Sequence, residues 1–114
     1  MKKIDKALMS GSTALLVLHL ISTRDMYGYE IVGELEARSR NVFSLKEGTL
    51  YPVLHGLEKD GFTTSYMKSA DTGKKRKYYK ITKKGTASLA QKKEEWAAFT
   101  SGVNNVIGEV SYAL

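Results

Sequence analysis

Apolar residues recur with the period of an α-helix along the first part of the chain, from Ile4 to Ile21. One face of this helix carries Ile4, Leu8, Gly11, Leu15 and Leu18. The other faces carry four more apolar side chains, Leu16, Val17, Leu20 and Ile21. A helix that is apolar nearly all round is buried on more than one side. We therefore expect one side to pack in the core of the domain and another to meet a second copy of the chain.

Two further helices follow, each with a single apolar face. Asp25 is predicted to cap the second helix, whose buried face consists of Gly28, Ile31, Val32 and Leu35. Arg40 and Asn41 then end the pattern. The buried face of the third helix consists of Leu50, Val53, Leu54 and Leu57. Gly61 is its predicted terminator.

The start of the third helix is where the local signals conflict. Ser44 and Glu47 have the spacing of a capping box, which would begin the helix directly after Ser44. That start places Pro52 in the helix interior, where proline costs about 3 kcal/mol. A helix that begins near Gly48 or Thr49 has Pro52 in its first turn at little cost. We therefore predict an irregular turn at 45–49 and a helix that ends near Lys59.

A hairpin is predicted after the third helix. Phe62–Met67 and Lys75–Ile81 are rich in β-forming residues, and the connection between them, Ser69–Gly73, ends in glycine. Thr82 then caps a long final helix. Every seventh residue of this helix is apolar, and a companion row lies beside the repeat: Leu89, Trp96, Val103 and Val110, with Phe99, Val106 and Ala113. This is the pattern of a coiled-coil-like seam.

The final helix is expected to be a separate unit. We divide the chain into a domain at 1–81, whose first helix also contributes to dimerisation, and a dimerisation helix at 82–114. Gly102 and Gly108 weaken the end of the helix, so we expect it to bend or fray after about residue 101.

The composition excludes several classes of protein. The 114 residues contain no cysteine and only two histidines, His19 and His55, which argues against disulfide scaffolds, thiol catalysis and common metal sites. No nucleophile–base set, phosphate-binding glycine loop or catalytic carboxylate pair is present, so we predict no enzyme, cofactor or metal. The first apolar segment is shorter than a membrane span and is interrupted by His19. We therefore expect a cytoplasmic protein without a membrane partner.

The net charge of +6 comes from one short segment. Residues 74–84 hold seven Lys and Arg and no acidic residue, while the rest of the chain is nearly balanced. Aromatic residues lie within this run, at Tyr78 and Tyr79. A compact basic segment with aromatic neighbours indicates contact with a polyanion. The alternative is a charged edge strand that resists aggregation.

The order of the elements is that of a winged helix-turn-helix: three helices, a hairpin and a further helix. In such folds the second helix of the helix-turn-helix enters the major groove of DNA. Here that helix is 46–59, and its polar face carries Gly48, Tyr51, Pro52, His55, Gly56 and Lys59. The alternative interpretation is a small, solvated polar face. The residues predicted to contact DNA are Lys46, Thr49, Tyr51 and His55 on the helix, and Lys74, Lys75, Arg76, Lys77 and Tyr78 on the wing.

Three strings of residues resemble the signature of the PadR-like transcriptional regulators. They are Tyr27-Gly28-Tyr29-Glu30-Ile31, then Glu47-Gly48-Thr49-Leu50-Tyr51-Pro52-Val53-Leu54, and Arg76-Lys77-Tyr78-Tyr79-Lys80-Ile81-Thr82 followed by Gly85. The resemblance covers nearly the whole chain, and the single final helix is similar to that of the compact subfamily. It implies a homodimeric repressor of its own or a neighbouring operon, with a pseudo-palindromic double-stranded operator. It also implies that the final helix packs against the first helix of the partner.

The resemblance also implies a dimer interface and an effector site. The predicted interface residues are Leu8, Leu15, Leu89, Trp96, Phe99, Val103 and Val106. A multidrug-sensing member of the family holds flat aromatic ligands with a tryptophan at a similar place, so Trp96 and Phe99 are candidates for binding a small aromatic inducer. The alternative is that both side chains only fill the interface. A second candidate function is a winged-helix module that binds an acidic partner.

Overall fold

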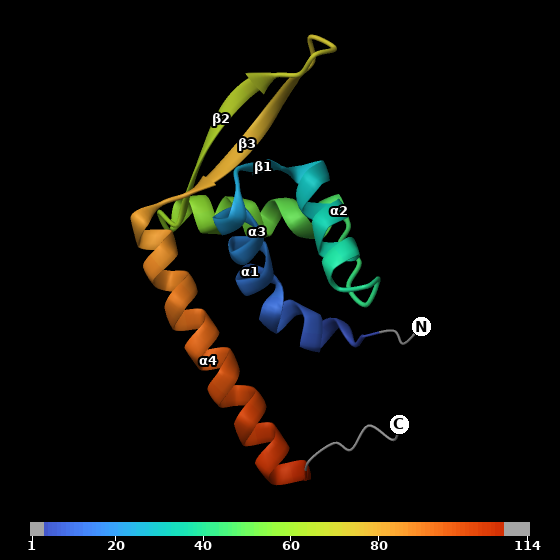
Figure 1. Ribbon diagram of the computed structural model, residues 1–114, viewed down its shortest axis with the longest axis vertical. Coiled ribbons are helices and arrows are strands. Elements are labelled where there is room, and N and C mark those ends of the chain that lie inside the picture. The colour runs from blue at the N-terminus through green and yellow to red at the C-terminus, as the bar shows by residue number, and fades with distance from the viewer. Residues whose placement is uncertain (1–3, 109–114) are drawn as a thin grey trace.

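The computed structural model describes residues 4–108 as four helices and a small antiparallel sheet. In chain order the elements are α1 (Lys6–Thr23), β1 (Met26–Tyr27), α2 (Gly28–Arg38), α3 (Glu47–Lys59), β2 (Thr63–Ser69), β3 (Lys75–Ile81) and α4 (Lys83–Ile107). The strand order is β1-β3-β2. The β2–β3 hairpin projects to one side of the helices and α4 extends to the other (Figure 1). The predicted class, mainly helical with a hairpin wing, is confirmed.

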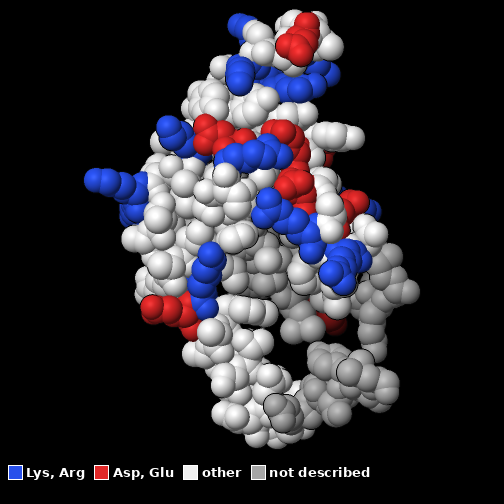
Figure 2. Space-filling model, in the orientation of Figure 1, with Lys and Arg blue, Asp and Glu red and all other residues white. Residues whose placement is uncertain are grey.

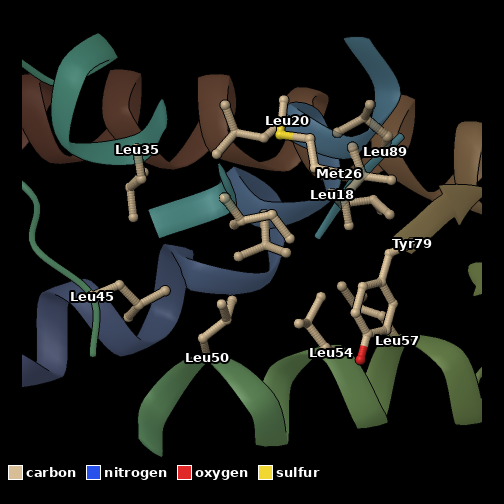
Figure 3. Close-up of a cluster of buried hydrophobic side chains, with 13 residues drawn as sticks. Leu18, Leu20, Met26, Leu35, Leu45, Leu50, Leu54, Leu57, Tyr79 and Leu89 are labelled. Atoms are coloured by element: carbon tan, nitrogen blue, oxygen red, sulfur yellow. The ribbon is translucent and has the colours of Figure 1, made fainter. Parts of the chain in front are cut away.

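The core forms where α1, α2 and α3 meet the inner face of the sheet. Val17, Leu18, Ile31, Leu50 and Leu54 are all fully buried there. Tyr79 from β3 reaches toward α3 beside Leu54 and Leu57 (Figure 3). The three apolar stripes of the sequence therefore converge on one cluster, which fixes α3 beneath the hairpin.

One side of the first helix packs in the core, as expected, and the contact of another side with a second copy stays a prediction. Val17, Leu18, Leu20 and Ile21 lie in the core, whereas Leu8 is exposed. By length and composition alone α1 could cross a membrane, and the core helix of a soluble protein passes the same test. Burial among α2, α3 and β3 accounts for the apolar character of its second half.

The predicted cap of the second helix is wrong. The helix begins at Gly28, and the backbone N–H of Tyr27 donates to Glu30 Oε1 at 3.3 Å. Asp25 instead accepts a hydrogen bond from the Tyr66 hydroxyl at 2.7 Å. The reason is the short strand β1, which the sequence did not reveal. Its pairing with β3 holds residues 26–27 extended, so the helix starts later.

The predicted start of the third helix is also wrong. The helix is regular from Glu47, with Lys46 as the capping position and no side-chain cap. Leu45 is buried in the core, which places Ser44 outside the first turn. Pro52 therefore lies inside the helix. It stands on the exposed face one turn after Gly48, whose carbonyl water can reach, and this limits the cost of the missing N–H. The predicted end at Lys59 is confirmed.

The hairpin and the final helix follow the prediction closely. The second strand has the predicted bounds, and the first runs from Thr63 to Ser69. Thr82 Oγ1 accepts a hydrogen bond from the Gly85 N–H at 2.9 Å, so the predicted cap is confirmed. Helix α4 continues through Gly102 to Ile107, beyond the predicted bend near residue 101. Val110 and Ala113 lie outside the described residues.

Candidate nucleic-acid interface

Helix α3 presents a polar face away from the core. Leu50, Leu54 and Leu57 are buried, whereas the face predicted from the sequence, Gly48, Tyr51, Pro52, His55, Gly56 and Lys59, is exposed. Lys46 and Thr49 are exposed at the N-terminal end of the helix. Two glycines on this face allow another molecule to approach the backbone closely. The structure therefore brings the four predicted helix contacts, Lys46, Thr49, Tyr51 and His55, to one accessible surface.

Tyr51 is half-exposed and its hydroxyl is directed at the start of α2. A methyl group on Gly28 would lie 2.9 Å from the Tyr51 hydroxyl oxygen and 3.3 Å from Cζ of the ring. A side chain at Gly28 would therefore require the Tyr51 ring to move. This contact ties the exposed face of α3 to the first turn of α2.

The basic residues of the wing do not act as one cluster. Lys74 and Lys75 are exposed near the turn. Since successive strand residues face opposite sides, Arg76 and Lys77 diverge. The Arg76 guanidinium lies over the Tyr27 ring at 4.6 Å on the outer face of the sheet. Lys77 is directed to the inner side, where its Nζ lies 4.0 Å from Glu58 Oε1. Figure 2 shows Lys and Arg gathered on the projecting hairpin.

Tyr78 and Tyr79 lie on opposite faces of the sheet, as neighbours on a strand do. Tyr79 is buried beneath the wing, and burial, with Glu58 and Tyr51 nearby, raises the pKa of its hydroxyl. Tyr78 faces the outer side of the sheet between Tyr66 and Tyr27. Its ring is stacked on that of Tyr66 at 5.7 Å. The Asp25 carboxylate, which accepts the Tyr66 hydrogen bond, raises the pKa of Tyr66 to about 12.

Sequence reasoning missed four residues of this outer face: Tyr27, Tyr29, Tyr66 and Lys68. The signal was present in part, because Tyr66, Lys68, Arg76 and Tyr78 alternate with inward-facing residues along the two strands. The contribution of Tyr27 depends on β1, which is two residues long and pairs with a strand about fifty residues later in the chain.

A second surface lies at the opposite end of the molecule, between α1 and α4. A groove of about 650 Å³ is lined by apolar side chains that include Leu8, Leu15, Phe43, Trp96 and Phe99. The Trp96 and Phe99 rings are stacked at 5.9 Å and are 44% and 57% exposed. No charged residue occurs between Trp96 and Ile107. The groove has the character of an interface rather than of a hydrated surface.

The predicted interface residues fall into two groups. Leu8, Trp96, Phe99, Val103 and Val106 are exposed, and Leu15 is half-buried in the groove. Leu89 differs, because it is only 6% exposed and packs in the core of its own protomer. This burial corrects its predicted role as a dimer contact, since the side chain has almost no area left to offer a partner.

His19 lies beside this groove and was not predicted to belong to it. It lines a smaller pocket with Phe43, Lys93 and Trp96. Burial lowers the pKa of the imidazole, and the positive charges of Lys93 and Arg38 lower it further. Its Nδ1 atom is buried and has no hydrogen-bond partner among the described residues. Within residues 4–108, no three His, Asp or Glu side chains form a group that could hold a metal ion.

The sequence is similar to a known protein family and to proteins of other bacteria. Residues 17–91 match the sequence model described as the transcriptional regulator PadR-like family. The chain is 35% identical to a transcriptional regulator of Mycobacterium tuberculosis over 81 residues, 71% of this chain and 72% of that protein. It is 42% identical to an uncharacterized protein of Lysinibacillus sphaericus over 90 residues, 79% of this chain and 83% of that protein.

Solved structures are similar over nearly the whole chain. A transcriptional regulator of Clostridium thermocellum superposes with a TM-score of 0.82 at 34% identity, covering 88% of this chain and 97% of that one. A PadR-like transcriptional regulator of Bacillus cereus superposes with a TM-score of 0.78 at 30% identity, covering 92% and 100%.

Proposed function

This chain belongs to the PadR-like family of transcriptional regulators, and on that premise we propose that it is a cytoplasmic, dimeric repressor of its own or a neighbouring operon. It is a DNA-binding regulator and not an enzyme. The observation that supports the proposal most directly is the pairing of two surfaces on one side of the fold. The exposed face of α3 suits the major groove, and the basic hairpin beside it suits the flanking backbone and minor groove.

The proposed DNA contacts are of two kinds, those to base edges and those to phosphates. Thr49, Tyr51 and His55 lie on the exposed face of α3, where side chains can reach base edges. Lys46 at the start of the helix, and Lys74, Lys75 and Arg76 on the wing, bind phosphates or enter the minor groove. Lys77 is the weakest of the proposed contacts because it is directed toward Glu58.

Dimerisation is proposed through α1 and α4. Five large apolar side chains on these helices remain exposed within the described part of one protomer: Leu8, Trp96, Phe99, Val103 and Val106. A two-fold arrangement would place α4 of one copy against α1 of the other, and it would cover these side chains on both copies. It would also present two α3 helices to one duplex.

The operator and its symmetry can be found in one experiment. We expect selection of bound fragments from a genomic or random DNA pool to return two half-sites about one helical turn, ~34 Å, apart. The affinity should fall with salt with a log–log slope of about −0.9 for each phosphate contacted. Absence of DNA binding even at low salt, together with a stable complex with an acidic protein, would overturn this function in favour of the interaction module.

A small aromatic inducer is proposed to bind at Trp96 and Phe99. Both rings line the groove between α1 and α4. Titration of the dimer with a panel of planar cationic dyes should quench the fluorescence of Trp96, the single tryptophan of the chain. The same dyes should release the operator. A flat response across the panel would remove the inducer from the proposal and leave repression intact.

A further inference from the structure

The outer face of the sheet carries a row of tyrosines that crosses all three strands. Tyr27 on β1 is directly opposite Tyr78 on β3, and Tyr78 is directly opposite Tyr66 on β2. Tyr29, at the start of α2, continues the row by stacking on Tyr27 at 6.4 Å. We call Tyr66, Tyr78, Tyr27 and Tyr29 the tyrosine row. Tyr29 and Tyr66 are 73% and 40% exposed, and Tyr27 and Tyr78 are half-buried.

Two cations lie on this row. Arg76 and Lys68 are opposite each other in the hairpin, two pairs nearer the wing tip than Tyr78 and Tyr66 and on the same face. The Arg76 guanidinium lies 4.6 Å from the centre of the Tyr27 ring, and Lys68 Nζ lies 5.6 Å from that of Tyr78. Within the described part of the chain, neither has a carboxylate partner within 4.0 Å. The aromatic rings thus orient positive charge that remains available to an anion.

The tyrosine row connects the wing to the face of α3. Tyr29 follows Gly28, over which the Tyr51 hydroxyl lies. From Tyr51 a chain of contacts therefore leads through the first turn of α2 and along the row to Arg76 and Lys68. Through these contacts the row links the helix proposed to read bases with the wing tip proposed to flank them.

We propose that the tyrosine row, with Arg76 and Lys68, binds the sugar–phosphate backbone of the operator duplex between those two contacts. This inference rests on the proposed function. Phosphate oxygens accept hydrogen bonds from Lys and Arg and from tyrosine hydroxyls. The hydroxyl of Tyr66 is not part of this set, because it donates to the Asp25 carboxylate. Duplex backbone fits better than single-stranded bases, because the ring faces of Tyr78 and Tyr27 already contact one another, neighbouring tyrosines and the two cations. Base stacking would need those faces free.

The test compares Lys68→Ala and Tyr29→Phe with Lys93→Ala, a matched variant of an exposed lysine on α4 outside the basic segment. Operator affinity is measured by fluorescence anisotropy over a range of salt concentrations. Lys68→Ala should make the salt slope shallower by about one phosphate contact, and Lys93→Ala should leave it unchanged. Tyr29→Phe keeps the ring but loses the hydroxyl, and should weaken binding about three- to tenfold.

A neutral methylphosphonate placed at single positions of the operator identifies the phosphate involved. At one position the substitution should weaken the wild type but cause no further loss in Lys68→Ala. The inference is overturned if Lys68→Ala and Tyr29→Phe, with unchanged circular dichroism, bind the operator like the wild type; repression then stands. It is also overturned if both variants lose affinity only for a poly(dT) single strand. If the wild type binds no duplex DNA, the proposed function itself fails.

Discussion

Gly85 is the residue at which the wing, the α3–β2 connection and α4 come closest together. A methyl group at this position would lie 2.0 Å from the Phe62 carbonyl oxygen and 2.8 Å from Ile81 Cγ1. The same carbonyl accepts the Thr82 N–H at 3.0 Å. The contact is with backbone rather than with a flexible side chain, so the structure cannot relieve it locally.

We expect Gly85→Ala to destabilise the fold by about 3 kcal/mol, since overpacking displaces the backbone that joins β3 to α4. Chemical denaturation measures the change in the free energy of unfolding. Gly33→Ala is the matched control, because Gly33 lies in α2 with open space around it. That control should be neutral or more stable, by up to about 1 kcal/mol. Equal effects of the two substitutions would contradict the packing argument.

His19 gives the fold a dependence on pH. Its pKa is lowered in the folded protein by burial and by Lys93 and Arg38, whereas in the unfolded chain it is about 6.5. The unfolded state therefore takes up a proton before the folded state does. The free energy of unfolding should be highest above pH 6.5 and should decrease as the pH falls from there toward the folded pKa.

Thermal denaturation between pH 7.5 and 5.5 checks this expectation. The wild type should lose stability over that range, and His19→Gln should lose less. His55→Gln, at an exposed position on α3, should keep the wild-type dependence. A wild-type decline that survives in His19→Gln would show that another group is responsible.

At the scale of elements, the alternation of side chains along β3 places the basic residues of the wing on two different faces. Lys75 and Arg76 lie at the tip and on the outer face, whereas Lys77 lies near Glu58 on the inner side. Lys75→Ala combined with Arg76→Ala should weaken binding to operator and to random DNA alike and reduce the salt slope by about two contacts. Lys77→Ala should have the smaller effect. Anisotropy titrations of all variants on both DNAs provide the measurement.

Helix α3 should behave differently from the wing. Thr49 is proposed to face the bases, so Thr49→Ala should alter the preference among operator variants by about 1–3 kcal/mol at one position. Competition assays with single-base operator variants measure this preference. Equal losses on operator and random DNA for both helix and wing variants would contradict the division of roles.

At the scale of the whole molecule, two ends have opposite character. The hairpin end is basic and the α4 end is apolar, with Val106 86% exposed. The described part of the protomer is elongated, with extents of 53 × 32 × 23 Å. Exposure of an apolar helix of this length to water is unfavourable, and a second copy of the chain would cover it.

Phe99→Asp should therefore convert the proposed dimer into a monomer of 12.7 kDa, because it places a charge in the apolar seam. Analytical ultracentrifugation at micromolar concentration measures the mass. Val42→Asp, at an exposed apolar position in the loop between α2 and α3, should leave the dimer intact. The proposal fails if the wild type is monomeric, or if Phe99→Asp sediments as the wild type does.

Most of the fold followed from local patterns in the sequence. The apolar stripes of α2 and α3, the bounds of β3, and the Thr82 cap depend on residues within a few positions of one another. The exposed face of α3 followed from helical geometry alone. The basic character of the wing was also a property of one continuous segment.

What the tertiary structure alone decided are contacts between residues far apart in the chain. Pairing of β1 with β3 moved the start of α2 and completed the tyrosine row. Burial of Leu45 set the start of α3, and burial of Leu89 removed it from the dimer surface. The closeness of Tyr51 to Gly28 and of Phe62 to Gly85 likewise depends on packing. Local periodicity determines which face of an element is apolar, but only packing determines what that face meets.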